Sequence, residues 1–305
     1  MSNNYLLLVD DKTLYPSIQG VDIENIYTTG GVIFRILRRI HLSTGVFRSA
    51  TRYWLDEWRH RIMFYDRVVV FDTLFNDYPL LFIQERAPKT KICLCYRNRV
   101  GKEMWRNPSI IRKRVECDIW TYSVDDADMY GLKLYSQFII FQPSYENRAN
   151  VNLDIFFIGT DKGRISLLAD LYKVFQNYRL KTRFIVVPDR GKKYNEEERK
   201  FLGKQMPYSE VLENILDSHA VLDLVSESNY GMTYRCLEAV FMRKKLITNY
   251  REIKNVDFYC KENIFVLGED SFDRLEEFVK TGYSCINEEV LKKYTFSHVM
   301  NEMFN

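Results

Sequence analysis

The stretch VLDLVSESNYGMTYRCLEAV (residues 221–240) decides the fold, because it passes from an apolar strand through a polar turn into a helix. Val221 to Val225 has the length and the apolar content of a buried strand. A helical pattern follows from Met232 to Met242. A polar turn between a strand and a helix offers unpaired backbone N–H groups and the positive end of a helix dipole, which suit a diphosphate.

Short apolar runs alternate with helical patterns along the whole chain. Strands are predicted at Tyr5–Val9, Arg67–Phe71, Lys91–Tyr96, Asp118–Tyr122, Phe138–Phe141, Leu153–Ile158, Arg183–Val187, Ala220–Leu224, Lys245–Thr248 and Ile264–Leu267. Helices are predicted at Val32–His41, Ser49–Met63, Arg164–Tyr178, Tyr208–Asp217, Met232–Met242 and Asn287–Phe304. Strands that alternate with helices predict parallel, doubly wound sheets.

The length of the chain favours two domains. Its 305 residues are 46% hydrophobic and can bury a substantial core. The polar segment Gln142–Asn152 separates two series of strands and helices, so we interpret it as a linker. The predicted division is 1–147, 148–285 and a C-terminal helix over 286–305 that crosses back to the first domain.

Composition excludes several classes of protein. Six scattered cysteines lack the paired spacing of a zinc site or a disulfide framework. Asp125, Asp126 and Asp128 follow Ser123 at the expected start of a helix, where capping explains them better than metal binding, and we predict no catalytic metal. The N-terminus has no signal-peptide pattern and no segment has about 20 apolar residues, so we expect a cytoplasmic protein.

The turn after Val225 contains residues suited to a nucleotide. Gly231 lets the backbone approach a ligand closely, and Arg235 can make a bidentate contact with phosphate. Glu238 lies on the same helix face and can accept hydrogen bonds from ribose hydroxyls. The alternative interpretation is that Arg235 and Glu238 form an ordinary surface ion pair.

A second turn, Gly159–Arg164, has similar chemistry. Lys162 and Arg164 can bring positive charge to the same diphosphate, where charge develops as the leaving group departs. Its spacing matches neither a dinucleotide fingerprint nor a Walker loop. The alternative is a polar loop with an exposed Lys and Arg.

These two turns, with segments around them, resemble a known family. The match covers residues 153–267 and includes Asp154–Gly159, Asp161–Arg164, Lys244–Asn249, Asp257–Tyr259 and Asn263–Phe265. Together they are similar to the donor half of bacterial GT-B glycosyltransferases that build lipopolysaccharide core and capsular polysaccharide. In the first half the resemblance is thinner and is carried by Asp118–Ser123, Asp125–Ala127 and Tyr130–Leu132.

The resemblance implies an α/β fold of the GT-B class, with two Rossmann-like domains facing a central cleft. It implies transfer of a sugar from a nucleotide diphosphate sugar to a surface-glycan acceptor, with no cofactor besides the donor substrate. Gly231, Thr233 and Arg235 would contact the diphosphate, and Glu238 the ribose. The predicted donor-binding residues are Gly159, Lys162, Arg164, Ser228, Gly231, Thr233, Arg235 and Glu238.

One departure from the family leaves the stereochemical course open. Many retaining members carry two glutamates eight residues apart, and the position eight before Glu238 is Tyr230. Glu227 could substitute from a shifted loop.

The acceptor side is less specific. The polar loop Asp10–Gly31 is long enough to be functional, with Gly30 and Gly31 expected near the sugar or the acceptor. Arginines and aromatic residues are interleaved after it, at Phe34, Arg35, Arg38, Arg39, Phe47, Arg48, Arg52, Tyr53, Trp54, Trp58, Arg59 and Arg61. This mixture favours a lipid-linked acceptor or the inner face of the membrane; nucleic acid is the second candidate, and a solvated pair of helices the third.

A general base is needed to take the proton of an acceptor hydroxyl. Asp72 is the first candidate, followed by His41 and Asp10. Asp72 could instead cap a helix and His41 could end one.

The main rival hypothesis is an inactive nucleotide- or glycan-binding protein with the same fold, and we do not expect a nucleic-acid partner.

Overall fold

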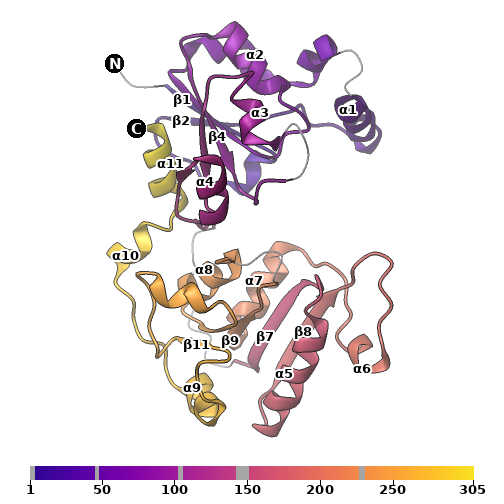
Figure 1. Ribbon diagram of the computed structural model, residues 1–305, viewed down its shortest axis with the longest axis vertical. Coiled ribbons are helices and arrows are strands. Elements are labelled where there is room, and N and C mark those ends of the chain that lie inside the picture. Colours follow the sequence, from indigo (N-terminus) through magenta and orange to yellow (C-terminus); the bar gives the residue numbers. More distant parts are fainter. Residues whose placement is uncertain (1–3, 45–47, 102–105, 142–150, 227–230) are drawn as a thin grey trace. The chain divides into compact units, whose positions relative to one another are not determined.

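The computed structural model describes residues 4–44, 48–101, 106–141, 151–226 and 231–305 (Figure 1). Contacts within the chain divide it into two compact units. The first comprises Met1–Phe141 with Thr295–Asn305, and the second Gln142–Tyr294. The predicted linker falls mainly on residues 142–150, which lie outside the described residues.

The first unit is built on a sheet of six parallel strands in the order β2-β1-β3-β4-β5-β6. The strands are β1 (Tyr5–Val9), β2 (Val21–Asn25), β3 (Arg67–Phe71), β4 (Lys91–Tyr96), β5 (Asp118–Thr121) and β6 (Lys133–Leu134). Because the chain passes from β1 to the edge and then returns to β3, the strand order reverses between β1 and β3. Ligands of doubly wound sheets bind at the carboxyl ends of the strands at such a point.

Helices cover this sheet on both faces, as the continuous apolar runs of its strands require. The helices of this unit are α1 (Val32–Thr44), which lies at its margin (Figure 1), α2 (Tyr78–Arg86), α3 (Pro108–Ile111), α4 (Val124–Tyr130) and the C-terminal α11 (Phe296–Phe304). Leu6, Leu8 and Val70 pack on one face together with Leu80 and Ile83 of α2. Leu7, Val9 and Val69 pack on the other face, which α11 covers.

Helix α11 closes the second face of this sheet. Its Phe296, Met300 and Met303 pack against Phe71 and against Cys93, which lies on the same face of the sheet as Cys95. Its N-terminal end is held by a hydrogen bond from the Phe296 N–H to the Ile139 carbonyl, 3.1 Å long. The strand predicted at Phe138–Phe141 was wrong: this segment makes a single bridge, from Ile139 to Thr295.

The long loop predicted at Asp10–Gly31 was also wrong in part, because the 3₁₀ turn η1 (Lys12–Leu14) and the edge strand β2 lie within it. Strand β2 reads Val-Asp-Ile-Glu-Asn, and because its polar residues interrupt the apolar run that is typical of a buried strand, its sequence resembles a loop. Charged side chains are common on edge strands, where they oppose pairing with another chain.

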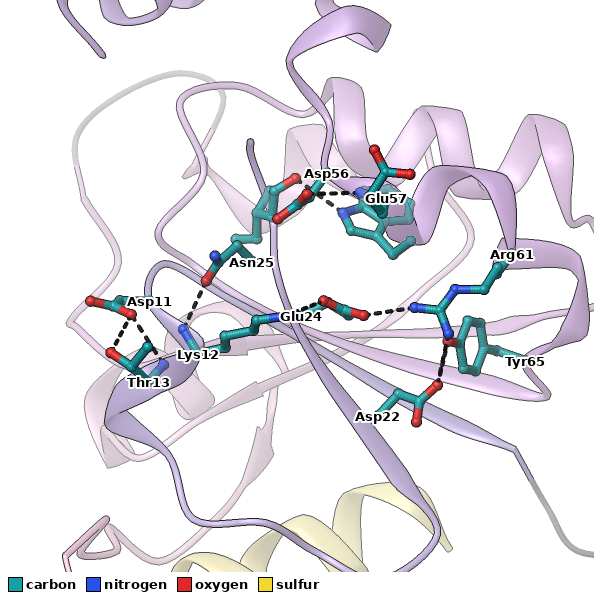
Figure 2. A network of polar contacts seen from close by, with 12 residues as sticks. Asp11, Lys12, Thr13, Asp22, Glu24, Asn25, Asp56, Glu57, Arg61 and Tyr65 are labelled. Carbon is teal, nitrogen blue, oxygen red and sulfur yellow. Dashed lines mark hydrogen bonds and ion pairs between the residues drawn. The ribbon is translucent and has the colours of Figure 1, made fainter. Parts of the chain in front are cut away.

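A network of ion pairs lines this edge (Figure 2). The Glu24 carboxylate accepts from Lys12 Nζ at 2.8 Å and from Arg61 Nη2 at 2.6 Å. The Tyr65 hydroxyl donates to the Asp22 carboxylate at 2.6 Å. Arg61, one of the arginines of the predicted basic surface, is therefore neutralised by acidic partners on β2.

The helix predicted at Ser49–Met63 is replaced by three 3₁₀ turns, η2 (Arg48–Trp54), η3 (Glu57–His60) and η4 (Ile62–Phe64). The backbone between the first two pairs with another segment instead of continuing a helix. Leu55 bridges to Tyr27, and the Trp54 carbonyl accepts from the Thr28 N–H at 2.9 Å. Tertiary pairing has overridden an apolar spacing that suits a helix.

The second unit contains five parallel strands in the order β11-β10-β9-β7-β8. They are β7 (Leu153–Thr160), β8 (Thr182–Val187), β9 (Ser218–Asp223), β10 (Lys245–Thr248) and β11 (Ile264–Val266), which confirms the five strands predicted there. The helices are α5 (Ile165–Asn177), α6 (Glu196–Arg199), α7 (Tyr208–Leu216), α8 (Tyr234–Phe241), α9 (Leu275–Lys280) and α10 (Glu288–Lys292), with the turns η7 (Arg251–Asn255) and η8 (Phe272–Arg274).

In this sheet the strand order reverses between β7 and β9. The chain leaves β7 for the edge strand β8 and then returns to β9 on the other side of β7.

Within the described ranges, no helix combines the length and the apolar content needed to cross a membrane.

The packing of α11 predicts a large loss of stability for Phe296→Ala. The Phe296 ring is 2% exposed and lies 5.6 Å from the Phe138 ring and 5.5 Å from the Tyr15 ring, centroid to centroid. Removing it leaves a cavity, and we expect the free energy of unfolding to fall by about 3–5 kcal/mol. Urea unfolding measures this, with the exposed Asn301→Ala in the same helix as the control. Equal stability of the two variants would contradict the proposed packing.

Candidate active site

The two turns singled out in the sequence lie side by side. One joins β7 to α5 and the other joins β9 to α8, and β7 and β9 are paired in parallel. The Arg164 guanidinium, from the first turn, donates to the carbonyl of Leu224, at the start of the second. The structure thus brings both turns to the point where the strand order of the second sheet reverses.

Arg164 is a structural tie between the two turns. Its guanidinium also donates to the carbonyls of Thr160 and, at 3.1 Å, of Asp161. Gly159 makes room for it, because a Cβ built there would lie 3.1 Å from Arg164 Nη2. Burial lowers the pKa of Arg164, while the carboxylate of Asp223 opposes this shift.

Asp161 and Lys162 set the shape of the first turn. The Asp161 carboxylate is buried, accepts from the Ile165 N–H at 2.9 Å and pairs with Lys192. Burial raises the pKa of Asp161, but the hydrogen bonds from Lys192 and Ile165 outweigh it and hold this pKa below its usual value. Lys162 has a left-handed backbone with φ of 44°, and its side chain is exposed.

The second turn opens into α8 as predicted. Thr233 caps the helix, its Oγ1 accepting from the Arg235 N–H at 3.1 Å. A Cβ built on Gly231 would meet no described atom within 4 Å, so the space beside this residue is open on the described part of the chain. Ser228, with Glu227 and Tyr230, lies outside the described residues.

Arg235 and Glu238 form the ion pair that the sequence left as an alternative. It is not a surface pair, because the Glu238 side chain is 2% exposed and that of Arg235 is 19% exposed. Burial raises the pKa of Glu238, against the opposing effects of the Arg235 charge and a hydrogen bond from Tyr208. The carboxylate is therefore held between a guanidinium and a phenol.

Asp223 was not identified from the sequence, although it occupies the centre of the site. This last residue of β9 is 5% exposed and accepts from Cys236 Sγ at 3.3 Å and from the Thr233 hydroxyl. Burial raises its pKa, and the charges of Arg235 and Arg164 oppose that shift. A carboxylate inside the apolar run Val221–Val225 was the signal that could have found it.

In the first unit, two of the candidate bases follow neighbouring strands. Asp10 comes after β1 and is exposed, while Asp72 comes after β3 and is 2% exposed. The Asp72 carboxylate accepts from the Arg97 N–H at 3.0 Å, which ties the ends of β3 and β4. Burial raises the pKa of Asp72, partly opposed by the Arg97 N–H and the charge of Arg106. Both candidates lie where the strand order of the first sheet reverses.

His41, Gly30 and Gly31 do not directly follow these strands in the sequence. They contact residues of α1 and η2. The His41 ring lies 5.9 Å from the Trp54 ring, centroid to centroid. A Cβ on Gly30 would lie 2.5 Å from the Phe34 ring, so this glycine permits close packing. The Gly31 carbonyl accepts from the Arg35 N–H as α1 begins.

The acidic start of α4 is explained by capping and pairing. Ser123 is the N-cap and accepts from the Asp126 N–H at 3.3 Å, as predicted. Asp126 accepts from the Val100 N–H at 3.0 Å, and Asp125 pairs with Arg99 at 2.6 Å. These carboxylates anchor the turn after β4.

Comparison with solved structures identifies the fold. No family model and no curated protein sequence matches this chain. AviGT4, a glycosyltransferase involved in avilamycin A biosynthesis, superimposes on 99% of this chain and 96% of its own, with a TM-score of 0.53 and 10% identity. Sucrose-phosphate synthase from Thermosynechococcus elongatus covers 99% of this chain and 97% of its own, with a TM-score of 0.54 and 10% identity. At this identity the likeness establishes the fold, and the chain has the α/β fold of the GT-B class that its sequence predicts.

The buried pair of Asp161 and Lys192 predicts a pH-dependent stability difference for Asp161→Asn. Because the folded protein lowers the pKa of Asp161, the stabilisation is complete above the unfolded-state pKa of about 3.9 and is lost as the pH falls through the lower folded-state value. At pH 7 we expect the variant to be less stable by about 1–3 kcal/mol. Urea unfolding from neutral to acidic pH should show this gap closing. The exposed Asp128→Asn is the control, and a gap independent of pH would contradict the assignment.

Proposed function

We propose that this protein is a glycosyltransferase that moves a sugar from a nucleoside diphosphate sugar to a lipopolysaccharide, capsular or other surface glycan. The second unit would bind the donor and the first unit the acceptor. The observation that carries the proposal is the meeting of two phosphate-suited turns at the β7–β9 reversal of strand order, in a chain with the GT-B fold.

The donor diphosphate would bind at the N-terminus of α8, beside Gly231 and Thr233. Backbone N–H groups and the helix dipole favour an anion there. Lys162 is the exposed cation on the neighbouring turn, and Arg235 lies in the first turn of α8. Arg164 would act on the diphosphate through its positive charge and not through hydrogen bonds, because its N–H groups already donate to carbonyls.

Glu238 has a different role in this proposal from the ribose contact that the family resemblance implies. Its carboxylate is 2% exposed and lies between Arg235 and Tyr208. A ribose could reach it only by separating this pair. We therefore assign Glu238 to holding the Arg235 guanidinium in place for the diphosphate.

In the proposed reaction, an acceptor oxygen bonds to the anomeric carbon of the sugar as the bond from that carbon to the diphosphate breaks. Negative charge develops on the departing diphosphate, where Lys162, Arg235 and the α8 N-terminus would stabilise it without a metal. The acceptor hydroxyl gives its proton to a base. Asp10 suits this step better than Asp72, because Asp10 is exposed and Asp72 is buried under the Arg97 N–H.

A panel of nucleotides tests the donor site directly. We expect at least one nucleoside diphosphate to raise the melting temperature, while the matching nucleoside does not, because the diphosphate supplies the charge that the turns bind. A ligand at a hundred times its Kd stabilises a protein by about 2.7 kcal/mol. Thermal shift with the diphosphates of all the common bases measures this. If none of them stabilises the protein, the donor site assigned here is wrong.

Substitution of Lys162 and Arg235 tests the roles of single residues. Lys162→Ala removes an exposed cation and should weaken diphosphate binding about tenfold or more, since a hydrogen bond to a charged group contributes about 1.5–3 kcal/mol. Arg235→Ala should weaken binding and abolish turnover. Titration calorimetry gives the binding constants, and Lys204→Ala, exposed in the same unit, is the control.

Two further measurements separate the possible outcomes. Arg235→Ala leaves Glu238 buried without its partner, so its folding must be checked by circular dichroism and compared with Arg235→Lys, which keeps the charge. Release of nucleoside diphosphate from the sugar donor in the absence of an acceptor distinguishes an enzyme from an inactive binding protein. Tight binding with no release would support the inactive protein.

A further inference from the structure

Helix α1 presents a broad apolar face to solvent. Val32, Ile33, Ile36, Leu37 and Ile40 recur at helical spacing and are each between 53% and 76% exposed. A different face of the helix is packed, where the Phe34 ring lies 4.9 Å from the Trp54 ring. Exposed apolar surfaces of this extent mark sites of interaction.

Cations accompany this apolar face. Arg35 and Arg39 are exposed on the same helix, and the α1 sequence VIFRILRRIHLST contains no acidic residue. Figure 1 shows α1 at the margin of the first unit, outside its layer of strands. A helix with one apolar and one basic face is the pattern that lies in a membrane interface.

A basic groove of about 440 Å³ opens in the same unit between η2, η3, η4 and α2. Arg52, Arg59, Arg86 and His60 line it. The three guanidinium groups contact neutral partners: Arg52 lies over the Tyr53 ring, Arg59 donates to the Leu55 carbonyl and Arg86 lies over the Phe82 ring. Their positive charges are thus held in place for an anion without being neutralised by these contacts.

Apolar groups surround the cations of the groove. Tyr53 and Met63 line it and are 65% and 67% exposed, and Phe64, which follows Met63 in the sequence, is 66% exposed. The turn η2 contacts both α1 and α2, so the groove adjoins the packing of α1 across η2. Cationic and apolar groups therefore alternate from α1 through η2 to α2.

We propose that this surface, formed by α1, η2, η3, η4 and α2, docks the protein on a bilayer that contains anionic phospholipid. The apolar face of α1 lies at the boundary of the acyl chains, and the basic groove binds a lipid phosphate. The charge complementarity between five arginines and an anionic surface commits the proposal to this partner. It deepens the proposed function by naming where a lipid-linked acceptor would be met, although docking itself requires no sugar transfer.

Vesicle sedimentation tests the proposal with the full chain. We expect the protein to sediment with vesicles of phosphatidylcholine and phosphatidylglycerol, much less with phosphatidylcholine alone, and less as salt is raised, because salt screens charge. Ile36→Glu should lower the partition coefficient at least about tenfold, since it places a charge in the apolar face. Arg52→Glu combined with Arg86→Glu should also lower it about tenfold or more, by removing the phosphate site.

Matched controls separate the surface from general effects of charge. Met129→Glu introduces a carboxylate at a side chain that is 71% exposed on α4, and it should bind vesicles as the wild type does. Lys200→Glu combined with Lys204→Glu makes the same change in net charge on the second unit and should also leave binding unchanged. Binding of a nucleoside diphosphate by Ile36→Glu serves as the check of folding. If the wild type binds vesicles but no nucleoside diphosphate, that result contradicts the donor site and leaves the docking surface supported.

Three results would overturn the proposal. One is equal binding of the wild type to neutral and anionic vesicles, or to neither. Another is a dimer in light scattering that Ile36→Glu converts to a monomer, without vesicle binding by the wild type, which would make a second copy the partner of α1. The third is binding of inorganic phosphate in the groove, lost in the Arg52 and Arg86 variant, by a chain that does not bind vesicles.

Discussion

The buried carboxylate of Asp223 is the interaction on which the second unit depends at its functional edge. It lies at the end of β9, with the charges of Arg164 and Arg235 close enough to oppose the effect of burial on its pKa. A charge removed from water is costly unless it is paired and hydrogen-bonded. Its hydrogen bonds come from the Thr233 hydroxyl and Cys236 Sγ at the start of α8, and the charge of Arg164 reaches it from the first turn, so both turns contribute to stabilising this carboxylate.

The same principle of topology positions the candidates in both units. In each sheet the chain passes from the first strand to an edge strand and then returns across the first. The residues that follow the two central strands are therefore brought together at one edge: Asp10 and Asp72 in the first sheet, and the turns with Arg164 and Thr233 in the second. A parallel sheet leaves crevices at these ends because the connecting helices turn away to opposite faces.

Much of the fold could be predicted from the sequence, since buried parallel strands are short continuous apolar runs and Lys91–Tyr96 and Lys245–Thr248 are of this kind. Strand β2 could not, because Asp22 and Glu24 on an edge strand resemble a polar loop. The segment 49–63 has helical spacing, but pairing of Leu55 with Tyr27 stops a helix, and such a contact between distant residues is not encoded in local spacing.

The candidate site was predictable to a similar depth. Strand-to-helix turns that suit phosphate are visible in the residues themselves, and the neighbouring positions of the two turns follow once β7 and β9 are paired. The sequence did not show which of these side chains are buried. The i,i+3 spacing of Arg235 and Glu238 is the same for a surface pair and for the buried pair observed, and the close approach of the Arg164 side chain to Gly159 depends on a contact that local spacing does not encode.

The pairing of Arg235 with Glu238 is compatible with a role for Arg235 in binding phosphate. A guanidinium has five N–H donors in a planar fork, so one edge can bind a carboxylate while others remain directed elsewhere. Glu238 cannot be left alone in a site where its side chain is 2% exposed, and this fixes Arg235 in one orientation. An arginine fixed in this way loses little conformational entropy when an anion arrives, because its side chain is already ordered by the carboxylate beneath it.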